Sequence, residues 1–183
     1  MRTKGYAGAA GVLPQFGVDP DLARTATLRR SAGHRIVAGL VEEKGIFVLL
    51  AALAGLDIAW RLHVMGTGPL EAKARRRAAQ LGLDDRISWA RGVASTLVPD
   101  RLRTFSVLVQ PSLTPAHWKE QFGRAVMEAM ACGVAVVGSA SAEIPNVIGD
   151  AGLLVPEGDA AALRDVTASI AHGDRGAPRR QSL

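Results

Sequence analysis

The chain has 183 residues and a mass of 19.2 kDa, which is enough for one ordinary domain and too little for two. Hydrophobic residues make up 48% and charged residues 21%, a balance that excludes an intrinsically disordered chain. The formal net charge of +5 would suit an anionic partner, but the basic residues are scattered and aromatic residues are only 4%. The densest basic cluster, residues 75–77, favours a solvated helix face, so nucleic acid is not an expected partner.

The cysteine count and the lengths of the apolar segments predict the cellular compartment of the protein. One cysteine, Cys132, excludes a disulfide framework and a multi-cysteine zinc site, and it favours a reducing compartment. The longest apolar stretch, residues 46–56, is shorter than the roughly 20 residues that cross a bilayer. No hydrophobic signal core follows Arg2 and Lys4. We therefore expect a cytoplasmic protein, with peripheral contact at the inner face of the membrane left open.

Short apolar runs of strand type alternate along the chain with longer segments of helical periodicity. Strands and helices that alternate in this way predict βαβ units, in which helices cover both faces of a parallel sheet. The fold class expected is therefore α/β: a doubly wound, Rossmann-like parallel sheet of about six strands. The predicted strands are 35–38, 60–65, 86–90, 105–110, 134–138 and 152–155, and the predicted helices are 44–55, 69–82, 95–103, 121–132 and 159–171.

Two helix ends carry specific signals. Gly133 follows the 121–132 segment and is the residue type that commonly ends a helix. Asp159 precedes the last helical segment and is a plausible N-cap. The basic, polar residues 173–183 are expected to form a disordered tail.

Ligands of open parallel sheets bind beyond the carboxyl ends of the strands, so the loops at those ends are the candidate sites. The first loop, residues 40–45, places Lys44 near the start of a helix, where the helix dipole disfavours a cation. A bound phosphate would explain this placement. An exposed loop lysine explains it equally well.

The second candidate loop contains Gly66 and Gly68, directly after a predicted strand. Two glycines allow the backbone to approach a ligand closely, and Pro69 suits a first helical turn. The third glycine of a dinucleotide fingerprint is missing. Taken alone, these residues indicate a structural glycine turn.

The third candidate loop, residues 111–128, is the richest in charge. If one helix carried both carboxylates, Glu120 and Glu128 would lie roughly 12 Å apart along it, about the span between the two sugar rings of a nucleoside-diphosphate sugar. A charged helix start with an Arg124–Glu128 salt bridge is the alternative. The backbone amides that would face the diphosphate belong to Gln121, Phe122 and Gly123.

Three other reactive side chains give weaker signals. His63 lies within a predicted strand and is expected to pack in the core, and Cys132 is expected to pack as a small hydrophobic residue. His117 lies in the third loop, where it could contact a substrate.

Four ordered segments, 40–45, 66–69, 118–138 and 149–156, resemble the motifs of the retaining family-4 glycosyltransferases of the GT-B fold. The segment 118–138 resembles that family's Glu-x7-Glu signature and the strand that follows it. The resemblance runs from about residue 12 to residue 171.

This resemblance implies a domain organisation. Residues 21–172 would be the C-terminal donor-binding domain. Residues 1–20 would be a remnant of the N-terminal domain and of the crossing between domains. The acceptor-binding N-terminal domain itself is expected to be absent.

The resemblance also implies residue roles. Lys44 would neutralise the donor diphosphate and Glu120 would contact the donor sugar, which makes these two the catalytic candidates. Glu128 would accept hydrogen bonds from the ribose hydroxyls. Neither a metal ion nor another cofactor is implied, because the donor is itself the substrate. The remaining substrate-binding candidates are Gly66 and Gly68 beside the nucleotide, Arg91, Gly92 and Val93 near the base, and Gln121, Phe122 and Gly123 at the sugar and phosphate.

The resulting functional hypothesis is transfer of a sugar, with retention, from a nucleoside-diphosphate sugar to a glycan or lipid-linked acceptor, as in polysaccharide biosynthesis. The family usually has Arg where this chain has Gly39, so one diphosphate contact is missing. A non-catalytic nucleotide-binding fragment is the alternative. The missing third glycine disfavours a dinucleotide-dependent oxidoreductase.

Overall fold

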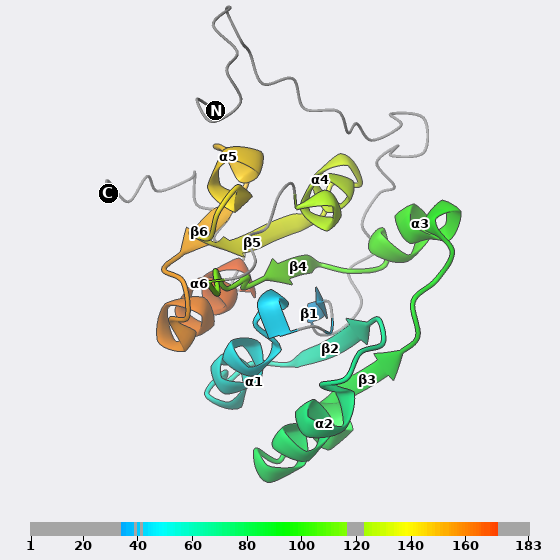
Figure 1. Cartoon of the computed structure of the whole chain (residues 1–183), viewed down its shortest axis with the longest axis vertical. Coiled ribbons are helices and arrows are strands. Elements are labelled where there is room, and N and C mark those ends of the chain that lie inside the picture. The colour runs from blue at the N-terminus through cyan, green and yellow to red at the C-terminus, as the bar shows by residue number, and fades with distance from the viewer. Residues whose placement is uncertain (1–33, 39, 41, 117–122, 172–183) are drawn as a thin grey trace, which may run out of the picture.

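A parallel sheet forms the centre of the computed structural model, which describes residues 34–38, 40, 42–116 and 123–171 (Figure 1). Within these residues the sheet has six strands in the order β3-β2-β1-β4-β5-β6, and every neighbouring pair is parallel. The predicted fold class, a doubly wound Rossmann-like sheet, is confirmed. The strands are β1 (His34–Ala38), β2 (Trp60–Met65), β3 (Ile87–Ala90), β4 (Val107–Gln110), β5 (Ala135–Ser139) and β6 (Leu153–Val155).

Helices pack on both faces of this sheet. Successive side chains of a strand point to opposite faces, so a strand of apolar residues contributes to a core on each side. Val107 and Val109 of β4 join a core with α1, α2 and α6, whereas Leu108 between them joins a second core with α3, α4 and α5. None of the helices in this part of the chain is long and apolar enough to cross a bilayer. The helices are α1 (Ile46–Ala54), α2 (Glu71–Gln80), α3 (Val98–Leu102), α4 (Arg124–Ala131), α5 (Ile144–Ile148) and α6 (Ala160–Ala171), with 3-10 turns η2 (Glu42–Lys44), η3 (Asp84–Arg86) and η4 (Ser95–Leu97).

Most predicted elements are found with boundaries shifted by one to three residues. Arg86 belongs to η3 rather than to a strand, and Phe105 lies before β4. The structure adds α5, which the sequence analysis missed. This helix is only five residues long, with Pro145 in its first turn, so its pattern is too short to show a helical period.

The predicted start of the fourth long helix at residue 121 is wrong. Gly123 has a φ of 60°, in the left-handed region, so α4 begins at Arg124. The expected separation of roughly 12 Å between Glu120 and Glu128 along one helix therefore does not apply. Glu120, Gln121 and Phe122 themselves lie outside the described residues.

Both predicted helix-end signals are confirmed. Gly133 takes a left-handed conformation, with a φ of 71°, immediately after Cys132, the C-cap residue of α4. The Asp159 Oδ1 atom accepts hydrogen bonds from the backbone N–H groups of Ala161 and Ala162, at 3.0 and 2.9 Å. Asp159 therefore caps α6 by satisfying two of its first amides.

Helical cover is unequal across the sheet. All four residues of β4 are buried, but β2 alternates, with Arg61 exposed and His63 half-buried on one face. The His63 Nδ1 atom lies 2.6 Å from the Ser88 Oγ atom, and the His63 ring packs 5.1 Å from that of Phe105. His63 thus packs against the buried Phe105 but is half-buried, so the prediction of a core histidine is wrong, because no helix in the described part of the chain covers this face of β2.

The strand order reverses between β1 and β4: β2 and β3 are added on one side of β1, and β4, β5 and β6 on the other. These strands are neighbours, yet α1 and α4 leave them on opposite sides of the sheet (Figure 1). The loop after β1 contacts the loop after β4 at Gly45, which has a φ of 66°. A Cβ on Gly45 would lie 1.9 Å from the Pro111 carbonyl oxygen. Beside this contact the Leu113 N–H donates to the Glu43 carbonyl oxygen at 2.8 Å. Such a switch point is where open α/β sheets bind ligands.

We predict that Gly45→Ala destabilises the fold far more than Gly82→Ala. Gly82 also has a left-handed φ, of 67°, but no atom lies within 4 Å of the position of an added Cβ. Both variants should lose about 1–2 kcal/mol from the left-handed backbone. Only Gly45→Ala adds a collision with main chain, which should cost a further 1–3 kcal/mol or so. Urea unfolding of both variants measures the difference, and equal losses would contradict the tight contact with Pro111.

Candidate functional site

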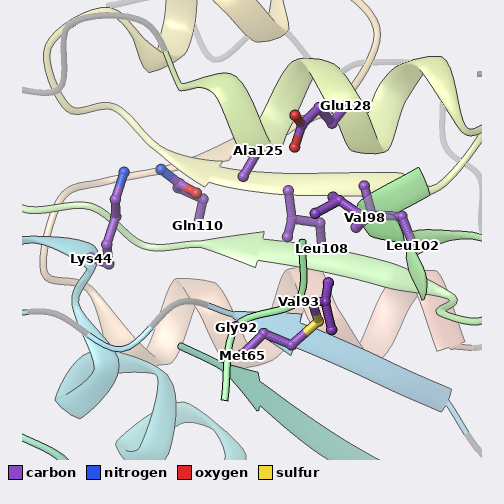
Figure 2. A pocket seen from close by; sticks show the side chains of 10 residues that line it. All are labelled: Lys44, Met65, Gly92, Val93, Val98, Leu102, Leu108, Gln110, Ala125 and Glu128. Atoms are coloured by element: carbon purple, nitrogen blue, oxygen red, sulfur yellow. The ribbon is translucent and has the colours of Figure 1, made fainter. Parts of the chain in front are cut away.

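A cavity of about 270 Å³ lies between the loops that follow β1 and β3, strand β4, helix α3 and the first turns of α4 (Figure 2). Its position matches the crevice expected at the carboxyl ends of the strands. Among the residues that the structure describes, ten line it: Lys44, Met65, Gly92, Val93, Val98, Leu102, Leu108, Gln110, Ala125 and Glu128.

The cavity has a polar end and an apolar end. Figure 2 shows the Lys44 and Gln110 side chains at one end, and Val98, Leu102 and Leu108 gathered at the other. Gln110 ends β4 and is 5% exposed. The apolar wall can exclude water from a flat or ring-shaped group, while the polar end can bind charge and hydrogen-bonding groups.

Glu128 brings a carboxylate to the cavity from α4. Its Oε1 atom accepts a hydrogen bond from the Arg124 Nε atom at 2.8 Å, so the predicted i,i+4 pair is present. The Arg124 side chain is 67% exposed and that of Glu128 only 16%. Because the partner is largely in water, this pair should contribute about 0.5 kcal/mol or less to stability. Glu128 can therefore pair with Arg124 and line the cavity at the same time.

Two helices begin at the polar end. Gly45 precedes α1 and Gly123 precedes α4, both as left-handed N-cap residues. Neither helix has a side-chain capping bond or an acidic residue in its first turn. The first N–H groups of a helix carry partial positive charge, and here Lys44 adds a full charge directly before α1. This end of the cavity is therefore suited to an anion.

The structure brings four of the predicted site residues together around the cavity, namely Lys44, Gly92, Val93 and Glu128. Gly66 follows the lining residue Met65 and donates its N–H to the Ala90 carbonyl oxygen at 3.0 Å. The other described candidates, Gly68, Arg91 and Gly123, do not line the cavity. Gly39, His117, Glu120, Gln121 and Phe122, like residues 1–20 and 173–183, lie outside the described residues.

Six lining residues were not predicted. A polar side chain at the end of an apolar strand could have indicated Gln110, because the carboxyl ends of strands are where ligands bind. The others have the residue types of ordinary core positions, so no sequence signal separates them from the core. They are Met65, Val98, Leu102, Leu108 and Ala125.

Cys132 lies buried at the end of α4, as predicted for a small packed residue. Burial raises the pKa of its thiol, while the nearby Arg103 guanidinium lowers it. Its Sγ atom lies 3.8 Å from the Pro99 carbonyl oxygen. Among the described residues, no three His, Cys, Asp or Glu side chains gather closely enough to hold a metal ion.

Comparison of the sequence with protein families gives one match that spans most of the chain. The sequence model of the family described as "Glycosyl transferases group 1" matches residues 35–182. A curated relative, the putative colanic acid biosynthesis glycosyltransferase WcaL of Salmonella typhimurium, is 37% identical over 133 residues. That match covers 69% of this chain and 33% of the relative. The chain thus spans about a third of the length of the curated relatives it matches.

Solved structures with similar folds include HepE of Anabaena in complex with UDP and glucose. It aligns with a TM-score of 0.74 at 22% identity, over 85% of this chain and 46% of its own. The catalytic domain of cholesterol-alpha-glucosyltransferase from Helicobacter pylori aligns with a TM-score of 0.66 at 22% identity, over 77% and 87%. At these identities the likeness shows the fold alone.

Proposed function

Because the chain belongs to the group 1 glycosyltransferases, we propose that it binds the nucleoside-diphosphate sugar donor from which a sugar is transferred, with retention, to a glycan or lipid-linked acceptor. The observation that carries the proposal is the cavity at the β1–β4 switch point. There Lys44 and the starts of α1 and α4 lie at one end, and Glu128 lies on the wall. HepE, which has a similar fold, was solved with UDP and glucose.

The nucleoside would occupy the apolar part of the cavity. Val93, Val98 and Leu108 offer apolar walls against which a base can pack. Glu128 would accept hydrogen bonds from the ribose hydroxyls, because an ionised carboxylate only accepts. Gly92 would let the base approach the backbone, with Arg91 beside it.

The diphosphate would lie at the polar end. Lys44 and the first N–H groups of α1 and α4 are positioned to hold the negative charge that grows on the nucleoside diphosphate as it leaves. Preorganised donors of this kind stabilise the departing group without a metal ion, and no metal or other cofactor is part of the proposal.

Other roles rest on the sequence resemblance. Glu120 would contact the donor sugar, and Gly66 and Gly68 would allow the nucleotide close to the backbone. We assign residues 21–172 to this donor domain, a range that overlaps the family match at 35–182. The colanic acid role in the WcaL name is compatible with a polysaccharide as acceptor. The remaining sugar and phosphate contacts would come from the amides of Gln121, Phe122 and Gly123.

We predict that nucleoside diphosphates and their sugars stabilise this chain against unfolding. A ligand that binds only the folded state at about 100 times its dissociation constant adds roughly 2.7 kcal/mol. Thermal unfolding with UDP, GDP, UDP-glucose and GDP-mannose at millimolar concentration measures the effect, with inorganic phosphate as the control for simple anion binding. If no nucleotide raises the Tm above the phosphate control, the proposed function is wrong.

We predict that Glu128→Ala weakens nucleotide binding and leaves the fold intact. Loss of a charged hydrogen bond to ribose should reduce affinity by about 1.5–3 kcal/mol, roughly 10- to 150-fold. Glu71→Ala is the matched control, because Glu71 also pairs with an arginine one helical turn away, at 2.7 Å to the Arg75 Nη2 atom. Glu71 lies on α2 and does not line the cavity. Titration calorimetry measures both variants.

The same experiment has a second control on the ligand side. A nucleoside diphosphate that lacks the 2′ and 3′ hydroxyls should bind wild type and Glu128→Ala equally well. A loss on Glu128→Ala that persists with this analogue would show that Glu128 does not act through ribose.

A further inference from the structure

Gln110 is a polar residue at the end of an otherwise apolar strand. The three residues before it in β4 are Val107, Leu108 and Val109, and all four are buried, with Gln110 only 5% exposed. Moving an amide from water into apolar surroundings costs free energy unless new hydrogen bonds replace those made with water. The position of Gln110 is therefore unfavourable for this residue type unless its side chain forms such bonds.

The geometry of the strand directs the Gln110 side chain into the cavity. Successive side chains point to opposite faces, so Gln110 lies on the same face as Leu108, roughly 6.6 Å further along β4. Leu108 lines the apolar part of the cavity and Gln110 its polar end (Figure 2). On β5 the residue paired with Gln110 is Gly138. A Cβ on Gly138 would lie 2.6 Å from side-chain carbons of both Ile144 and Ile148, so the β5 side of Gln110 is apolar.

Two hydrogen-bond donors meet at the polar end of the cavity. Figure 2 shows the Lys44 ammonium and the Gln110 amide nitrogen turned toward the same space. An amide offers two N–H donors and an acceptor oxygen, so Gln110 can bind a ligand while it also bonds to the protein. Because the amide is uncharged, burying it costs far less than burying a second cation. The low dielectric of the interior strengthens a hydrogen bond from this amide to an anion. The two donors together fit the oxygens of an ionised phosphate.

We propose that Gln110 is a further binding residue for the donor diphosphate: its amide N–H donates to a phosphate oxygen beside Lys44. This inference rests on the proposed function. The proposed contacts of the nucleoside are different ones, namely Glu128 at the ribose and the apolar walls at the base. Gln110 therefore adds a directional bond to the charge of Lys44 and acts on the phosphates rather than on the nucleoside.

The first experiment measures, by titration calorimetry, the affinity for UDP or GDP, whichever wild type binds more tightly. Gln110→Leu removes the amide and should weaken binding at least fivefold. Gln110→Glu should weaken it at least 30-fold, because an ionised carboxylate cannot donate and repels phosphate. Gln80→Glu is the matched control, since Gln80 is exposed on α2 and does not line the cavity, and it should change the affinity less than twofold. Unchanged affinity in Gln110→Leu, or tighter binding in Gln110→Glu, would overturn the proposal.

The second experiment observes the Gln110 amide directly in the wild-type chain by nitrogen-15 NMR. The side-chain NH2 signals of Gln110 are assigned by their absence in Gln110→Leu. They should shift on titration with inorganic pyrophosphate and with the nucleoside diphosphate, whereas the NH2 signals of Gln80 should not. Signals that shift with the nucleoside alone and not with pyrophosphate would mean that the amide contacts the base or the ribose, and the proposal would be wrong.

The two experiments separate this proposal from the function on which it depends. If wild type binds neither UDP nor GDP, the proposed function is wrong and the donor role of Gln110 is wrong with it, while pyrophosphate still decides whether Gln110 binds phosphate. If wild type and Gln110→Leu bind the nucleoside diphosphate equally well, the proposed function stands and Gln110 is not a binding residue. If Gln110→Glu does not fold, as judged by circular dichroism, Gln110→Leu decides, because leucine suits an apolar strand.

Discussion

The close contact between Gly45 and the Pro111 carbonyl oxygen holds the candidate site together. It joins the loop after β1 to the loop after β4, the two neighbouring strands whose helices leave toward opposite faces of the sheet. Only a residue without a Cβ fits there, and its left-handed backbone also sets the direction in which α1 begins. The position of Lys44, directly before this glycine, is therefore fixed by a main-chain contact rather than by its own side chain.

The electrostatics of the site follow from that geometry. A lysine beside a helix start is disfavoured by the helix dipole, and here a second helix start, that of α4, lies at the same crevice. Positive charge gathered in this way does little for stability, but it prepares the crevice for an anion with no need to rearrange on binding. Glu128, which pairs with Arg124, supplies the one carboxylate among the described residues that line the cavity.

The cavity exists because helical cover of the sheet is incomplete. The layer of α3, α4 and α5 buries β4 and β5, but it leaves one face of β2 to Arg61, His63 and Met65. Gly92 and Val93, after β3, complete the wall at that side. Space for a ligand thus lies between strands β4 and β5, which helices cover, and strand β2, beside which the loop after β3 forms the wall.

The sequence by itself determined the βαβ alternation, the cap at Asp159 and the helix end at Gly133, because hydrophobic periodicity and backbone preferences depend on neighbouring residues. It also singled out Lys44 and Glu128, which the structure places on the lining of one cavity. Tertiary structure alone decided the start of α4 at Arg124, the apolar wall of Met65, Val98 and Leu108, and the bond from Glu157 to Thr114. Leucine or valine beside a ligand has the same residue type and spacing as one in a core. A carboxylate 43 residues from its partner leaves no local pattern, since only the order of the strands brings the two loops together.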